Sequence, residues 1–322
     1  MFSQTILLCW GKESSKKKPK KIVVLGSLNV DTIQHLNKLP ERGETIHLNG
    51  LTSAPGGKGA NQAVAAARQG ADVSFIGAVG NDANGRFMKQ TLSDNKIDVS
   101  HIVTKKVPTG SAYIMLEADG NNTILVYGGA NMQVSVEDVR AASSLIESAD
   151  AIITQFETPV TAAVEAFEIA KRKDVLTILN AAPAQKIDPK LLSISDFVTP
   201  NESEAQVLID QKVQFTKESL NNAALSFEKL GVKNTLITLG EHGSFYKFGQ
   251  QEGIIPSFKV KAVDTTAAGD TFIGSFTANL KPDLSNLTDA LTWATRSSSL
   301  TVQKAGALPS IPTFEEVETA MR

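Results

Sequence analysis

Short runs of apolar residues alternate with helical patterns along most of the chain. Residues 22–25 form a continuous apolar run, which is typical of a central parallel strand covered on both faces. Residues 63–69 are rich in alanine and end at Gly70, as a helix with a glycine stop does. Further strands are expected at 73–79, 151–154, 175–179, 197–198 and 234–239, and further helices at 159–171, 289–302 and 313–321. This order predicts an α/β fold with a mostly parallel central sheet.

A second pattern, with apolar and polar residues in alternation, marks segments outside that order. Residues 111–117 and 122–127 alternate around Asp119-Gly120-Asn121, which is typical of a β-hairpin. Residues 32–52 also indicate short strands, broken near Pro40. We therefore expect residues 32–52 and 108–128 to form a small sheet over the main domain. Residues 244–247 and 252–256 indicate antiparallel edge strands.

Residues 1–20 differ in pattern from the rest of the chain, because an apolar patch precedes a stretch of lysines and serines. A secretory signal has its charge before the apolar run, so this order does not match one. The lysine run favours a solvated, disordered leader over a nuclear or anionic-surface signal. We therefore place the folded domain at residues 21–322.

Composition describes an ordinary soluble globular protein. Of the 322 residues, 42% are hydrophobic and 20% charged, and the net charge is −2, which favours neither nucleic acid nor a membrane as a partner. Cys9 is the single cysteine of the sequence, so an internal disulfide is excluded. The four histidines are far apart and give little support for a zinc site or a Ser-His-Asp triad. A cytoplasmic location fits this cysteine usage.

Candidate chemistry is concentrated between residues 264 and 270. Three small residues, Ala267, Ala268 and Gly269, precede a run with helical periodicity, which predicts a tight loop that opens into a helix. The free N–H groups and the dipole of a helix start attract anions. Asp270 would repel a phosphate there, unless it takes a proton from a nucleophile that attacks the phosphate. An ordinary helix start with a favourable acid is the alternative interpretation.

Polar residues also come directly after several predicted strands, where α/β proteins bind ligands. Asn29 and Asp31 come after residues 22–25, and Glu157 comes after residues 151–154. The glycine loop at 56–59 leads into a helix, but its spacing is not that of a Walker loop. Turn formation and helix capping remain alternative explanations for all of these residues.

Six motifs with this chemistry occur in one order across about 300 residues. From Lys21 onward the chain resembles the PfkB carbohydrate kinases, and within that family those that act on ribose. The motifs are GSLNVD (26–31), PGGKGANQA (55–63), ETP (157–159), TPNESEA (199–205), TLGEHG (238–243) and DTTAAGDTF (264–272). The resemblance implies a ribokinase-like three-layer αβα fold and phosphorylation of ribose at O5 by ATP.

The resemblance also assigns roles residue by residue. Asp270 matches the catalytic base, and Ala267, Ala268 and Gly269 match the anion hole. The positions that hold the sugar are matched by Asn29, Asp31, Gly57, Lys58, Asn61, Glu157 and Asp270. The nucleotide site is matched by Asn201, Glu204, Thr238, Leu239, Gly240, Glu241, His242, Gly243, Gly269 and Thr295. Asn201 and Glu204 form the pair that the family links to Mg²⁺ and phosphate positioning.

Further implications concern a second cation and the small sheet. A K⁺ site is implied at Asp264, Thr266, Thr301, Lys304, Gly306 and Ser310, partly through backbone carbonyls. The small sheet is implied to act as a lid and as the interface of a homodimer. Departures from the family pattern are Ile273, where Asn is frequent, and Ser275, where Ala or Gly is usual. Both concern packing behind the anion hole and leave Asp270 unchanged.

Other functions stay open at this point. A sibling kinase would act on deoxyribose, fructose, adenosine or a sugar phosphate; the last would need more cationic residues than Lys58 in the sugar pocket. A regulator that binds a sugar without catalysis is disfavoured, because Asp270 and the anion hole are intact. A dehydrogenase is disfavoured by the missing GxGxxG motif.

Overall fold

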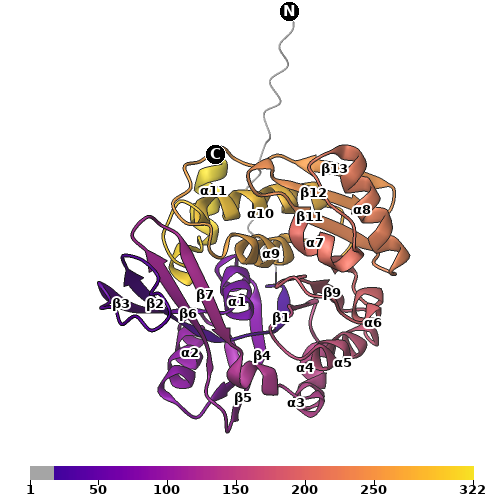
Figure 1. Ribbon diagram of the computed structural model, residues 1–322. Helices are drawn as coiled ribbons and strands as arrows, with labels where there is room; N and C mark the ends of the chain where they lie inside the picture. The colour runs from indigo at the N-terminus through magenta and orange to yellow at the C-terminus, as the bar shows by residue number, and fades with distance from the viewer. Residues whose placement is uncertain (1–17) are drawn as a thin grey trace, which may run out of the picture.

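The computed structural model describes residues 18–322, so the predicted leader lies almost wholly outside the described residues. Nine strands form the large sheet in the order β13-β12-β11-β10-β9-β8-β1-β4-β5 (Figure 1). Neighbours from β11 to β5 are parallel, whereas β12 and β13 are antiparallel at one edge. The bounds are β1 Lys21–Leu25, β4 Asp72–Gly80, β5 Asp98–Lys105, β8 Ala151–Thr154, β9 Leu176–Leu179, β10 Phe197–Val198, β11 Asn234–Thr238, β12 Ser244–Phe248 and β13 Gln251–Ile255.

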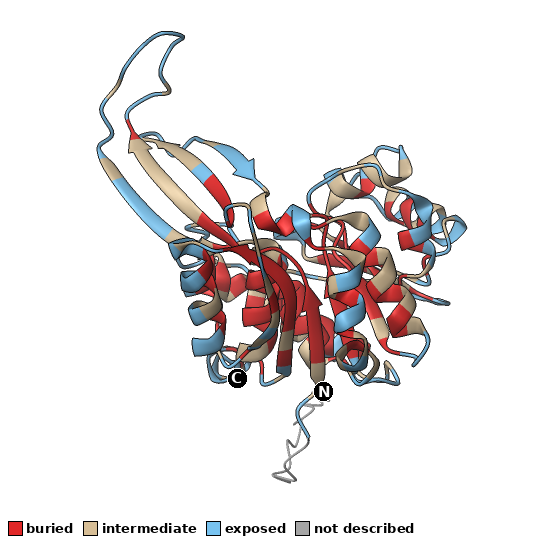
Figure 2. Cartoon of the chain, turned by 90° about the horizontal axis from the view of Figure 1, so that it is seen from below, coloured by how far each residue is buried: buried red, intermediate tan, exposed pale blue. Residues whose placement is uncertain are grey.

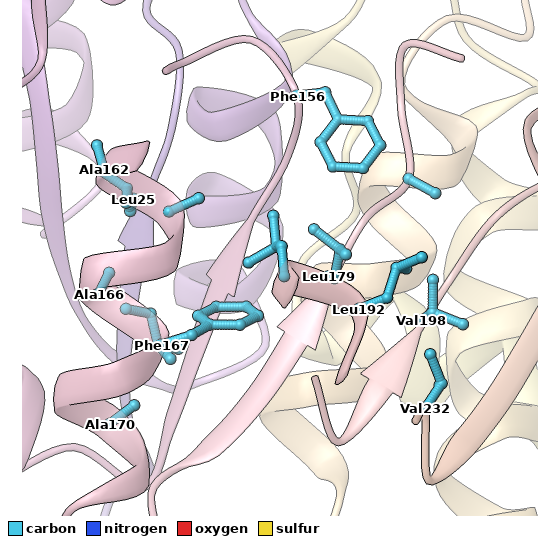
Figure 3. Packing of buried hydrophobic residues seen from close by; sticks show 14 of the residues in the cluster. Leu25, Phe156, Ala162, Ala166, Phe167, Ala170, Leu179, Leu192, Val198 and Val232 are labelled. Atoms are coloured by element: carbon cyan, nitrogen blue, oxygen red, sulfur yellow. The ribbon is translucent and has the colours of Figure 1, made fainter. Parts of the chain in front are cut away.

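Helices cover both faces of this sheet, as the continuous apolar strands predict. Val23 and Leu25 of β1 contact the core on the side of α5 and α8, whereas Ile22 and Val24 contact the core formed with α1, α9 and α10. Figure 3 shows Phe167 and neighbouring alanines of α5 against the strands. The helix bounds are α1 Lys58–Arg68, α2 Ala83–Asp94, α3 Val136–Ala141, α4 Ser143–Glu147, α5 Val160–Lys171, α6 Pro189–Ser193, α7 Glu202–Ile209, α8 Lys217–Lys229, α9 Ala268–Asn279, α10 Leu287–Thr301 and α11 Phe314–Met321, with 3-10 turns η1 Gly129–Gln133, η2 Gly240–His242 and η3 Leu308–Ser310.

The predicted small sheet is present, with four strands in the order β3-β2-β6-β7. They are β2 Asn29–Leu36, β3 Gly50–Gly56, β6 Gly110–Glu117 and β7 Asn122–Tyr127, of which β2 and β6 are parallel. In Figure 2 this sheet extends away from the buried strands of the main domain, and its outer parts are exposed. The predicted segments 32–52 and 108–128 therefore contain these strands, although the sheet begins at Asn29 and ends its first hairpin at Gly56.

Close packing of small residues brings α1 against α9. A Cβ atom added to Gly274 of α9 would lie 2.5 Å from the carbonyl oxygen of Gln62 in α1. A Cβ added to Gly59 would lie 2.5 Å from the backbone nitrogen of Ser27, just after β1. These approaches bring the first half of α1 against the middle of α9 and against the end of β1.

The first described residues correct the expected domain boundary. Lys20, assigned above to the leader, donates from Nζ to the carbonyls of Thr277 (2.9 Å) and Leu280 (2.6 Å) at the end of α9. Burial lowers the pKa of Lys20 to about 8, against the attraction of Asp150. Unpaired carbonyls at a helix end attract a cation, so Lys20 belongs with the folded domain.

Candidate active site

Asp270 lies in the first turn of α9 and is 8% exposed. Its carboxylate accepts two hydrogen bonds from the first half of α1. Asn61 Nδ2 donates to Oδ2 at 2.9 Å, and Gln62 Nε2 donates to Oδ1 at 2.8 Å. The two amides therefore fix the orientation of the carboxylate at the start of the helix.

The loop before Asp270 presents free backbone N–H groups. Ala267 has a left-handed backbone (φ 61°), which turns the chain sharply into α9. Within residues 18–322 no acceptor meets the N–H of Ala267, Gly269 or Asp270, whereas Ala268 N–H donates to the Thr265 carbonyl at 3.2 Å. The space above Gly269 is open, since a Cβ there would meet no atom within 4 Å. Two of the three residues predicted for the anion hole thus offer a free donor, and Ala268 does not in this conformation.

Three further predicted residues form a charged cluster, in which Lys58 faces Asp270 and Glu157, and Glu157 faces Asp31. Ser27 Oγ donates to Glu157 Oε2, and Lys58 N–H donates to the same oxygen at 3.2 Å. Burial, together with the nearby Glu157 carboxylate, raises the pKa of Asp31 to about 6. Burial alone would lower the pKa of Lys58, but the carboxylates of Asp270, Glu157 and Glu204 outweigh it and raise that pKa. Lys58 is therefore a stable positive charge among three carboxylates.

Asn29, the first residue of β2, is oriented by a residue that the sequence did not indicate. Asn131 Nδ2 donates to Asn29 Oδ1 at 2.8 Å and to the Leu28 carbonyl at 3.2 Å, and Asn131 Oδ1 accepts from Leu28 N–H at 2.9 Å. Gly110 at the start of β6 lies against both amides, and a Cβ there would be 2.2 Å from Asn131 Nδ2. Asn131 thus joins the chain entering the small sheet to the chain leaving it.

Asn201 and Glu204 form a capping box at the start of α7. Glu204 N–H donates to Asn201 Oδ1, and Asn201 N–H donates to Glu204 Oε2, both at 2.9 Å. Burial is the main cause that raises the pKa of Glu204; the hydrogen bond from Asn201 and the charge of Lys58 oppose it. The helix-cap interpretation therefore describes this conformation, yet Glu204 also faces the charges of Lys58 and Asp270.

The predicted nucleotide loop comes after β11, beside that capping box. Thr238 pairs with Asn201 in an isolated bridge, and Gly243 (φ 95°) closes the turn over η2. His242 stacks on Phe215, with ring centroids 4.1 Å apart and planes 6° apart. Thr295 is buried in α10, and its hydroxyl donates to the Leu291 carbonyl at 2.8 Å.

Asp264 joins the two loops of the predicted K⁺ site. Its Oδ1 accepts from Thr266 N–H and hydroxyl, and its Oδ2 accepts from Gly306 N–H at 2.8 Å. These bonds hold the pKa of Asp264 below its usual value despite partial burial. Lys304, by contrast, directs its ammonium to Glu316 at 2.8 Å, and Thr301 and Ser310 bond through their hydroxyls inside the fold. Any contribution of Lys304 to a cation site would therefore come through its backbone carbonyl.

The donor set fits Mg²⁺ held largely by nucleotide phosphates. Between residues 18 and 322 no three His, Cys, Asp or Glu side chains converge as a metal cage. Mg²⁺ usually needs only one or two carboxylates besides phosphates and water. Glu204, which faces the charge of Lys58, offers one. K⁺ is coordinated by carbonyl and hydroxyl oxygens. The loop around Asp264 and the loop around Gly306 both carry such oxygens.

Comparison with known proteins places the chain in a family. The sequence profile of the pfkB family of carbohydrate kinases matches residues 19–314. The chain belongs to this family. It is 46% identical over 299 residues to a ribokinase of Staphylococcus aureus, covering 92% of this chain and 98% of that protein. It is 47% identical over 300 residues to a bifunctional ribokinase/ribose-5-phosphate isomerase A of Fructilactobacillus sanfranciscensis, of whose length it spans 55%.

Solved structures agree with the family and confirm the expected fold. The structure of Arabidopsis thaliana ribokinase complexed with ribose and ATP has a TM-score of 0.88 to this chain at 31% identity, with 95% of this chain and 99% of that one covered. In the part of the chain that the structure describes, no helix is both long and apolar enough for a membrane span.

Sequence reasoning missed four buried polar residues of this region: Ser27, Gln62, Asn131 and Asn180. Gln62 and Ser27 stand inside the six motifs, so their position was a usable signal. Asn131 and Asn180 lie outside the motifs and more than 100 residues from the atoms they contact in Leu28 and Gln62. No local pattern identifies such partners.

Proposed function

We propose that this protein is a ribokinase, which transfers the γ-phosphoryl group of ATP to O5 of D-ribose and forms ribose 5-phosphate and ADP. The observation that carries the proposal is the buried Asp270 carboxylate, fixed by two amides directly beside free N–H groups at the start of α9. The identity to ribokinases over more than nine-tenths of the chain supports ribose as the substrate.

Asp270 acts as the general base in the proposed reaction. It takes the proton of the ribose O5 hydroxyl as that oxygen attacks the γ-phosphorus, and the bond to ADP breaks. The N–H groups of Gly269 and Asp270, with those of Ala267 and Ala268, stabilise the charge on the phosphoryl oxygens. Ala268 N–H must first leave the Thr265 carbonyl. Bound with the nucleotide, Mg²⁺ supplies positive charge to the phosphates.

The remaining assignments divide between the two substrates. Asn29, Asp31, Gly57, Lys58, Asn61 and Glu157 hold the ribose hydroxyls. Asn201 and Glu204 position phosphate and Mg²⁺, while residues 238–243, Gly269 and Thr295 hold the nucleotide. The positive charge of Lys58 lies among Asp270, Glu157 and Glu204, and these carboxylates raise the pKa of Lys58 and keep it charged.

A monovalent cation and a second copy of the chain complete the proposal. The loops around Asp264 and Gly306 would hold K⁺, and the bound ion would order the loop that precedes the free N–H groups. The small sheet closes over ribose to exclude water, and its exposed apolar residues, among them Leu125 (58%) and Val126 (61%), form a homodimer interface. The enzyme works in the cytoplasm.

A coupled enzyme assay that measures ADP formation tests this function. Ribose, deoxyribose, fructose and adenosine are each assayed with K⁺ and with Na⁺. We expect turnover selective for ribose and raised by K⁺. Asp270→Asn should reduce kcat by about 10²–10⁴-fold with ribose binding retained. Selective turnover of another substrate would show that ribose is the wrong substrate. A smaller loss of kcat in Asp270→Asn would show that Asp270 is not the base.

A further inference from the structure

Gln62 lies at the centre of a buried chain of amides that ends at Asp270. Its side chain is fully buried on α1. Gln62 Nε2 donates to Asp270 Oδ1 at 2.8 Å and to Asn180 Oδ1 at 2.9 Å, and its Oε1 accepts from Gln155 Nε2 at 2.7 Å. Both N–H bonds and the carbonyl of this amide are therefore used inside the protein.

The direction of the chain is set by a backbone carbonyl. Asn180 Nδ2 donates to the carbonyl of Thr199 at 3.1 Å. Since a carbonyl can only accept, Asn180 must turn its NH₂ group to Thr199 and its oxygen to Gln62. Gln62 must then turn its NH₂ group to Asn180, and the second hydrogen of that group points at Asp270. Asp270 Oδ1 thus always faces a donor.

The other carboxylate oxygen has a different neighbour. Asp270 Oδ2 accepts from Asn61 Nδ2 at 2.9 Å, while Asn61 Oδ1 is buried and has no partner within residues 18–322. No carbonyl fixes the Asn61 amide, so this amide can turn and offer its oxygen to a proton on Oδ2. The two oxygens of the base therefore differ in their capacity to hold a proton.

We propose that Gln62 is a positioning residue for the base: it keeps Asp270 Oδ1 as an acceptor only and directs the abstracted proton to Oδ2. The inference rests on the proposed function, in which Asp270 is the base. As the O5–H bond breaks, the proton forms a bond to Oδ2. The electron pair left on O5 forms the bond to phosphorus, and the bond from phosphorus to the ADP oxygen breaks.

The test compares the pH dependence of kcat/KM for ribose in two variants. Gln62→Met keeps the side-chain volume but removes a hydrogen bond that favours the ionised carboxylate. We expect the acidic limb of the profile to move to higher pH and kcat to fall by about 10–100-fold, with both KM values changed less than about threefold. Gln62→Glu places a second carboxyl beside Asp270, so its acidic limb should move further, by about 1–3 pH units.

Gln69 provides a matched control at the end of the same helix. It is also buried and bonded at both ends of its amide, to the Pro312 carbonyl (3.1 Å) and to Trp293 Nε1 (2.8 Å), but it does not contact Asp270. Gln69→Met and Gln69→Glu should lower the melting temperature and leave the acidic limb in place. If Gln62 had only a structural role, Gln62→Met and Gln62→Glu would also lower the melting temperature and leave the acidic limb in place.

The outcomes separate this inference from the proposed function. If Asp270→Asn is nearly inactive while Gln62→Met has the wild-type limb and kcat, the positioning role is wrong and the base assignment stands. If Asp270→Asn keeps its activity, the base assignment itself is wrong. Where Gln62→Met does not fold, an unmoved limb in Gln62→Glu overturns the inference, and a raised limb supports it.

Discussion

The large and the small sheet use the same apolar residue types in opposite environments. In the large sheet both faces are covered, and Phe276 of α9 is completely buried between helix and strands. In the small sheet Leu51, Leu125 and Val126 are each about 60% exposed. The large sheet therefore forms the closed core that positions Asp270, whereas the small sheet exposes apolar side chains on its surface. The burial colours of Figure 2 show this division.

A pair of truncations measures the difference directly. Phe276→Ala should lower the free energy of unfolding by about 3–5 kcal/mol, because a cavity is left in a closed core. Leu125→Ala should cost less than about 0.5 kcal/mol in dilute protein, because its side chain is already in water. Chemical denaturation gives both values. If the stability lost in Leu125→Ala grows with protein concentration, a second copy of the chain covers this surface. If the loss is large at every concentration, the contrast between the two sheets is wrong.

The junction between the two sheets should give the next largest effect. Asn131→Ala leaves the N–H and carbonyl of Leu28 without their partner, each costing about 1–3 kcal/mol if water does not replace it. It also releases Asn29, so KM for ribose should rise about tenfold while kcat changes little. Denaturation and steady-state kinetics measure the two effects. Asn121→Ala at the exposed tip of the β6–β7 hairpin is the control, and equal effects from both would refute a special role for the junction.

Asp31→Asn should change stability less than Phe276→Ala or Asn131→Ala, and in the opposite direction. The folded pKa of Asp31, about 6, lies above the ordinary 3.8, so the folded state binds the proton more tightly than the unfolded state. Ionisation of Asp31 therefore lowers the free energy of unfolding. This loss is absent below about pH 4, grows between about pH 4 and pH 6, and is constant at higher pH. Asp31→Asn should therefore stabilise the free enzyme by about 1–2 kcal/mol at pH 8 after solvent screening, and weaken ribose binding. Thermal unfolding at pH 4 and pH 8 tests the sign: stabilisation of equal size at both would contradict it.

The sequence alone identified most of the parallel strands, several helices and the principal catalytic candidate, although it did not predict β5, α2 or α8. Continuous apolar runs identified β1 and its parallel neighbours, since only strands covered on both faces show them. Alternation identified the β6–β7 hairpin, and small residues before a helix identified the loop that precedes Asp270. These signals involve residues that are near one another in the chain, so they can be recognised in the linear sequence. The family match at residues 19–314 confirmed the class of kinase.

Only the tertiary structure decided how these pieces act on one another. Gln62 and Asp270 are 208 residues apart, and Asn131 and Leu28 are 103 apart, so no periodicity connects them. The sequence also left the Asn201–Glu204 pair between a helix cap and a ligand site, and the folded chain shows the cap. A hydrogen bond between distant side chains depends on helix packing, here the close approach of α1 and α9 at Gly274, which the linear pattern does not contain.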